Sequence, residues 1–141
     1  MAWAGRVRSG DSLEVIAGDV TTRAGFAARY GSLGGAAFVD AAHRNATGAA
    51  PTATWASTWT DRLAAGTATR AEVMAAIAAL PAAVTRLRPE VEVMMTYAGL
   101  LRRAPDASGY AFWLDKVRAG TSIQRLIAQF FASAEYRRRF A

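Results

Sequence analysis

Residues 101–113 read LRRAPDASGYAFW, and this stretch decides the fold. A segment with the apolar spacing of a helix precedes and enters it, at Val91, Met94, Met95, Ala98 and Leu101. Pro105 interrupts that helix, because the residue before a proline avoids the helical region. Asp106 then supplies a carboxylate for the free N–H groups of a second helix, which Gly120 ends. The sequence therefore predicts a helix over residues 91–103, a tight break and a second helix.

Similar helix start signals recur along the chain. Three segments have the pattern of a capping box, in which a polar residue is followed three positions later by Glu or Gln: Asp11–Glu14, Thr69–Glu72 and Thr121–Gln124. Ser133 is placed to cap a last short helix. The alternation of apolar residues that is typical of strands is nowhere sustained. We predict an all-α fold, an array of short helices.

Three tryptophans open similar segments. Trp59 begins WTDRLAAGT, and Trp113 begins WLDKVRAGT 54 positions later. Trp3 begins WAGRVRSGD, 56 positions before Trp59. This predicts one helical domain over residues 1–141 built from units of about 54 residues: a half unit (1–31), a degenerate unit (32–86) and a full unit (87–141). We expect the recurring tryptophans to pack in the core, and the chain to be a segment of a longer protein.

Composition excludes several kinds of chemistry. The chain has 141 residues, of which 52% are hydrophobic and 20% charged, enough for a packed core. It contains no cysteine and a single histidine, His43, so thiolate metal sites, cysteine nucleophiles and His-dependent triads are excluded. No nucleophile elbow, phosphate loop or dinucleotide loop is present, and no two acids are paired for acid–base work. We expect no enzyme and no cofactor, and no apolar run approaches the roughly 20 residues of a membrane span.

The net charge of +6 comes almost entirely from arginine, with Lys116 as the only lysine. A basic face attracts nucleic acid, anionic lipid or acidic polysaccharide. The arginines are scattered, however, apart from the run Arg137–Arg139, and solvated helix faces with a basic tail explain this distribution. No nucleic-acid-binding signature accompanies them, so we expect no nucleic-acid partner.

The stretch at 101–113 resembles the signature of a bacterial family known as domain of unknown function 4214. Its members typically read L-G-R-x-P-D-x-x-G-x-x-Y-W, followed by a helix ending in Gly and another ending in S-x-E-F/Y. Arg102 departs from the usual glycine and Phe112 from the usual tyrosine, while the matching positions are Arg103, Pro105, Asp106, Gly109, Trp113, Gly120, Ser133, Glu135 and Tyr136. The resemblance is specific over residues 91–141 and degenerate over 36–86.

The family is similar in helical plan to phycobilisome linker domains, and its members lie mostly in secreted and surface-layer proteins, beside glycosyl hydrolases, exopolysaccharide enzymes or calcium-binding repeats. The resemblance implies an extracellular or cell-surface location and a non-catalytic, lectin-like role in binding a surface glycan or exopolysaccharide. The alternative is a structural module that mediates protein–protein assembly. Neighbouring domains of a larger parent protein are expected partners in either case.

Four residues are the expected ligand-binding set: Trp55, Arg103, Asp106 and Tyr110. Arg103 and Asp106 flank the helix break, where they either fix the turn by a cap and a salt bridge or face a ligand as donor and acceptor. Trp55 replaces the signature glycine in the second unit and either offers a sugar platform or fills space. A calcium ion needs six to eight oxygens, far more than residues 106–109 provide, so we expect no metal.

Overall fold

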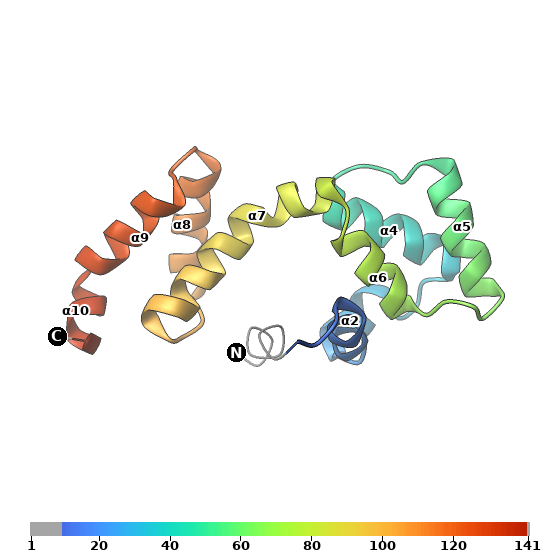
Figure 1. Ribbon diagram of the computed structural model, residues 1–141, viewed down its shortest axis with the longest axis horizontal. Coiled ribbons are helices and arrows are strands. Elements are labelled where there is room, and N and C mark those ends of the chain that lie inside the picture. Colours follow the sequence, from blue (N-terminus) through green and yellow to red (C-terminus); the bar gives the residue numbers. More distant parts are fainter. Residues whose placement is uncertain (1–9, 141) are drawn as a thin grey trace. The chain divides into compact units, whose positions relative to one another are not determined.

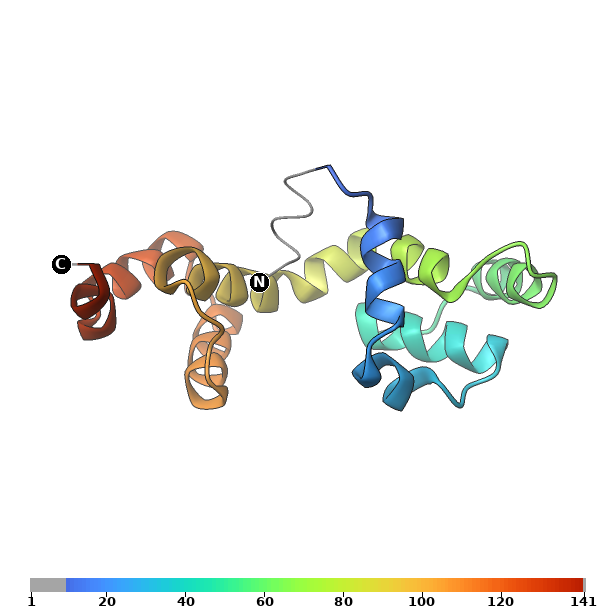
Figure 2. The same cartoon turned by 90° about the horizontal axis from the view of Figure 1, so that it is seen from below.

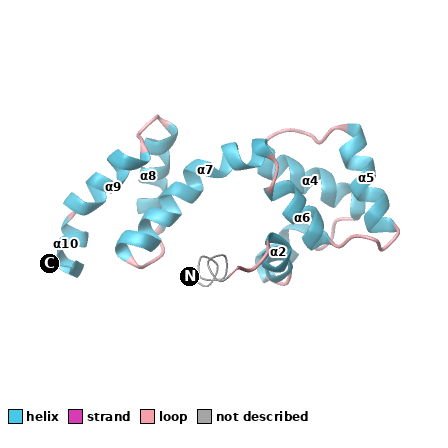
Figure 3. Cartoon of the chain, viewed as in Figure 1, coloured by secondary structure: helices cyan, strands magenta, loops and turns pink. Residues whose placement is uncertain are grey.

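The computed structural model describes residues 10–140, and every regular element within them is a helix (Figures 1 and 3). The predicted all-α class is confirmed. The chain divides into two compact units, one ending at Arg86 and the other beginning at Leu87. This division falls at the predicted boundary between residues 32–86 and 87–141. We describe each unit by itself.

The first unit contains five described helices: α2 (Leu13–Thr21), α3 (Ala24–Tyr30), α4 (Gly35–Thr47), α5 (Ala53–Ala64) and α6 (Arg70–Ala78). Helix α2 packs mainly on α6, and α4 packs on both α5 and α6 (Figures 1 and 2). The centre of the core is Phe38, which is completely buried on α4 and contacts the ring of Tyr30 from α3. Val73 and Ile77 of α6 complete the same cluster.

Helix α7 (Pro81–Thr96) crosses the division and continues into the second unit as a short π-helical segment, η1 (Tyr97–Leu101). The unit is completed by α8 (Ala107–Arg118), α9 (Ile123–Ala132) and α10 (Ala134–Phe140). Its core consists of Val93, Tyr97, Leu101, Leu126 and Phe130. Each unit therefore has a hydrophobic cluster of its own.

The helix expected over 91–103 belongs to a longer helical stretch, α7 and η1, which begins at Pro81 and ends at Leu101. Leu101 is buried as expected, but most of the predicted face is not. Val91, Met94 and Met95 are exposed, whereas Val93 and Tyr97 are buried. The apolar pattern misses the buried face because apolar residues lie on both faces, Val91 on the exposed one and Val93 and Tyr97 on the buried one. Thr96, which is polar, is buried as well. Thr96 satisfies its hydroxyl within the helix by donating to the carbonyl of Glu92 at 2.7 Å.

The predicted helix starts are confirmed in part. Thr69 and Glu72 form a complete capping box, and Asp106 and Ser133 accept hydrogen bonds from the N–H groups expected. The other two boxes are wrong by one residue: Ser12 and Ser122 are the N-caps, not Asp11 and Thr121. In both segments a serine follows the predicted cap, and its short hydroxyl accepts from the N–H group three residues later.

The first and last residues of several helices repeat at the spacing of the similar sequence segments. Both ends of α8 lie 54 positions after those of α5, and both ends of α10 lie 110 positions after those of α3. The number of repeats remains a prediction. Trp59 and Trp113, expected to be mostly buried, are partly exposed but pack against the cores of their units. Trp3 lies outside the described residues.

Candidate functional site

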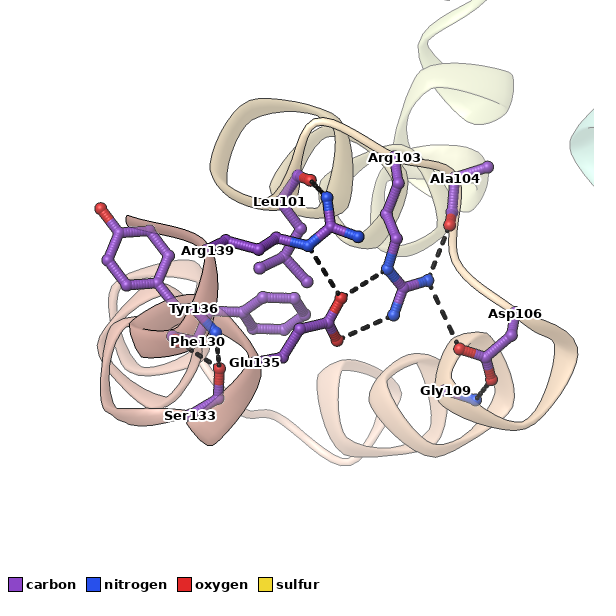
Figure 4. A network of polar contacts seen from close by, with 10 residues as sticks. All are labelled: Leu101, Arg103, Ala104, Asp106, Gly109, Phe130, Ser133, Glu135, Tyr136 and Arg139. Atoms are coloured by element: carbon purple, nitrogen blue, oxygen red, sulfur yellow. Dashed lines mark hydrogen bonds and ion pairs between the residues drawn. The ribbon is translucent and has the colours of Figure 1, made fainter. Parts of the chain in front are cut away.

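The helix break of the signature is held by one arginine (Figure 4). Arg103 donates to both carboxylate oxygens of Glu135, from Nε at 2.6 Å and from Nη2 at 2.9 Å. Its Nη1 donates to the carbonyl of Ala104 at 2.8 Å and lies 3.4 Å from the Asp106 carboxylate. The guanidinium also stacks on the ring of Tyr97. Arg103 thereby ties the break to α10, which is 32 residues away in sequence.

The acids of this network are held in the ionised form. Hydrogen bonds from the Gly109 N–H and the Ser108 hydroxyl lower the pKa of Asp106 to about 2. The hydrogen bonds from Arg103 lower the pKa of Glu135. Most donors of Arg103 are occupied within the fold, and its side chain is 27% exposed. The cap and salt bridge that we gave as one alternative are therefore present; ligand binding by this pair remains a prediction.

The predicted ligand-binding residues belong to different units. Arg103, Asp106 and Tyr110 lie in the second unit, and Trp55 lies in the first. Tyr110 is half-buried against the second core cluster, where burial raises its pKa. Trp55 is half-buried against the first cluster, with its ring 5.0 Å from that of His43 and 5.9 Å from that of Trp59.

The position of Trp55 has a steric explanation. In the second unit the hydroxyl of Tyr97 lies against Gly109, so closely that a Cβ atom would overlap it. The residues 54 positions earlier are His43 and Trp55, whose rings are packed together. The smaller ring of His43, where the second unit has Tyr97, thus accompanies the larger side chain of Trp55, where the second unit has Gly109. Trp55 therefore occupies space at this junction; whether it also offers a sugar platform stays a prediction.

A pocket that the sequence does not reveal lies in the first unit. It has a volume of about 280 Å³ and is bounded by the indole of Trp59 from α5 and by Glu14 at the start of α2. Glu72 of α6 lies on the same rim, and the rest of the lining is apolar: Leu13, Ala75, Ala76 and Ala79. Because Glu14 and Glu72 are 58 positions apart, only the packing of α2 on α6 brings them together.

Both carboxylates of this pocket are acceptors. Hydrogen bonds from Thr69 hold the pKa of Glu72 below its usual range, and a hydrogen bond from Ser12 does the same for Glu14. Glu72 uses Oε2 for the capping box with Thr69, and Oε1 is not part of that box. The indole of Trp59 carries the guanidinium of Arg62 at 4.5 Å from its centroid. The pocket thus combines an aromatic wall with two ionised acids.

Other kinds of site are missing from the described part of the chain. Within residues 10–140, no three His, Asp or Glu side chains are grouped so that they could hold a metal ion. None of the helices there is both long and apolar enough to cross a membrane.

Comparison with known proteins bears on the signature. Neither a curated protein nor a solved structure matches the chain. A family model does match, over the segment that contains the helix break, the Arg103 network and all of α8, α9 and α10. The resemblance seen in the sequence is thereby confirmed: residues 90–140 match the family described as Domain of unknown function (DUF4214).

Proposed function

We propose that the chain is a non-catalytic carbohydrate-binding module of a secreted or cell-surface bacterial protein. The observation that carries this proposal is the pocket formed by Trp59, Glu14 and Glu72. Arg62 covers one face of the Trp59 indole, and the apolar part of the indole that lines the pocket suits the C–H face of a sugar ring. Ionised carboxylates accept hydrogen bonds from neighbouring hydroxyls. The location rests on the family resemblance alone.

The charge of the pocket defines its ligand further. Two ionised carboxylates outnumber the one neighbouring cation, Arg62, and so disfavour a sugar that carries its own acid and favour neutral or amino sugars. They also argue against hydrolysis, because a glycosidase needs one carboxyl group whose pKa is raised so that it can donate a proton. The pKa values of Glu14 and Glu72 are both lowered. Binding without catalysis is the function that this arrangement supports.

A glycan array, probed with and without calcium, tests the proposal. We expect the chain to bind neutral or amino-sugar glycans, and the double variant Glu14→Gln/Glu72→Gln to lose that binding. Glutamine preserves the shape and the capping position of Glu72. Asp61→Asn serves as the control, since Asp61 is an exposed acid on the same helix as Trp59 and does not line the pocket.

Two results would contradict this site. Full binding by the double variant would exclude the pocket. Binding lost instead on Asp106→Asn or Trp55→Phe would return the site to the residues expected from the sequence.

The alternative function, protein–protein assembly, is favoured by a separate observation. Helix α7 exposes four large apolar side chains in the second unit: Leu87, Val91, Met94 and Met95. Exposed apolar patches of this kind mark interaction surfaces. Absence of binding on the array, together with self-association in solution that Met94→Asp abolishes, would favour assembly over carbohydrate recognition.

A further inference from the structure

Three aromatic rings of α9 and α10 lie in a contiguous row whose two outer rings are exposed, while the middle ring, Tyr136, packs partly against the second core cluster. The centroids of Phe131 and Tyr136 are 4.8 Å apart, and those of Tyr136 and Phe140 are 4.9 Å apart. Phe131 is 46% exposed and Phe140 is 44% exposed. Contiguous exposed apolar side chains, unlike single ones, mark interaction surfaces. Exposed rings in mutual contact form a surface on which a linear ligand can stack.

Arginines flank this row and add positive charge. The guanidinium of Arg102 lies 5.8 Å from the ring centroid of Phe140. Arg137 is exposed on α10, beside the face that carries Tyr136 and Phe140. Across residues 10–140, neither Arg102 nor Arg137 forms a salt bridge, unlike Arg103 and Arg139, which pair with Glu135. Their charge is therefore available to a ligand.

The backbone of Arg102 is strained. Its φ of 51° and ψ of 33° lie in the left-handed region, and among the described residues it is the only non-glycine with positive φ. A side chain in this region costs free energy that glycine does not. The fold uses the Arg102 side chain only for the contact with Phe140. Such strain is typical of positions where the side chain serves function.

We propose that Arg102, Arg137 and the row Phe131–Tyr136–Phe140 bind an acidic polysaccharide. Sugar rings stack on the aromatic row, and their carboxylates pair with the guanidinium groups, whose planar donors match a carboxylate in two bonds. The inference rests on the proposed function for its class of ligand, a carbohydrate. It concerns a second site in the other unit, with ligand charge opposite to that favoured by the pocket at Trp59.

Calorimetric titration of the whole chain with polygalacturonate tests this site. Its fully methyl-esterified form is the matched probe, because it differs only in lacking the carboxylate charge. We expect the chain to bind the acid polymer, with an affinity that weakens as salt is added, and not to bind the ester.

Arg102→Gly should lower the affinity by about threefold to tenfold, the equivalent of one charge-assisted contact. The same variant should raise the melting temperature, since glycine relieves the strain. Loss of affinity in a protein that has become more stable cannot be attributed to unfolding.

Phe140→Ala should weaken binding as well, whereas Arg88→Gln should leave it unchanged. Arg88 is an exposed arginine on α7, and its removal changes the net charge by the same amount. An equal loss in Arg88→Gln, or full affinity in both Arg102→Gly and Phe140→Ala, would overturn the proposal. So would binding through these residues to phosphatidylserine vesicles or single-stranded DNA but not to polygalacturonate. If neutral glycans still bind through Glu14 and Glu72 in that case, the proposed function holds although this second site does not.

Discussion

At the scale of single residues, Gly109 shows why the signature requires a glycine. An alanine in a helix is normally more stable than glycine by about 1 kcal/mol. At Gly109, however, a Cβ atom would overlap the Tyr97 hydroxyl and would lie 3.2 Å from both carboxylate oxygens of Asp106. We expect Gly109→Ala to lower the free energy of unfolding by about 1–3 kcal/mol, the usual cost of overpacking. Chemical denaturation measures this difference.

Two variants check the steric origin of that effect. Gly99→Ala, at a position with open space around it, should be neutral or stabilising. Tyr97→Phe removes the hydroxyl that the new Cβ would meet, so Gly109→Ala should cost less in that background. Equal costs of Gly109→Ala with and without the hydroxyl would show that Tyr97 is not the obstacle.

Arg103 is the second residue whose removal tests the site. We expect Arg103→Ala to reduce the free energy of unfolding by about 1–2 kcal/mol, because charge-assisted hydrogen bonds are lost at partly exposed groups. Arg88 makes a single hydrogen-bonded pair with Glu92 and is far more exposed. Arg88→Ala should therefore change stability by no more than about 0.5 kcal/mol. Urea titration of both variants provides the comparison, and similar costs would contradict a special role for Arg103.

The same network predicts the response to acid. The pKa values of Glu135 and Asp106 are lower in the folded chain than in the unfolded chain. Their contribution is therefore complete above the unfolded pKa values and is lost as the pH falls from about 4 toward about 2. Arg103→Ala should weaken this dependence without abolishing it, because Asp106 keeps its bonds from Gly109 and Ser108. An unchanged acid profile would show that Arg103 does not set the pKa of Glu135.

At the scale of helices, the start of α9 gives a sharp test. Ser122 accepts from the N–H of Arg125, whereas Thr121 lies outside the helix. We expect Ser122→Ala to cost about 1 kcal/mol of stability, the usual value of an N-cap. Thr121→Ala should cost much less. A larger loss for Thr121→Ala, measured by thermal unfolding, would restore the cap that the sequence pattern suggests.

The helices also show what the sequence can reveal. Helix α8 is predictable at both ends because its signals are local: Asp106 caps the start, and Gly120, with φ of 96°, follows the end. The buried face of α7 is not predictable in this way, because apolar residues lie on both of its faces, with Val91 and Met94 exposed and Val93 buried. The pocket at Trp59 depends on α2 lying against α6, and no local pattern reports a contact between helices so distant in sequence.

At the scale of the whole molecule, the two cores should respond to mutation separately. Phe38 is completely buried in the first unit, and Phe130 is buried in the second. The described members of each cluster all come from their own side of the division. Phe38→Ala and Phe130→Ala should each cost about 3–5 kcal/mol in the unit that contains the substitution. Amide hydrogen exchange of the full chain resolves where that cost falls, because a destabilised unit opens more often. We expect Phe38→Ala to accelerate exchange at α4 and α6 while α9 keeps its protection, and Phe130→Ala to do the reverse. If either substitution removes protection from both units equally, the chain unfolds as one cooperative domain, as the sequence alone led us to expect.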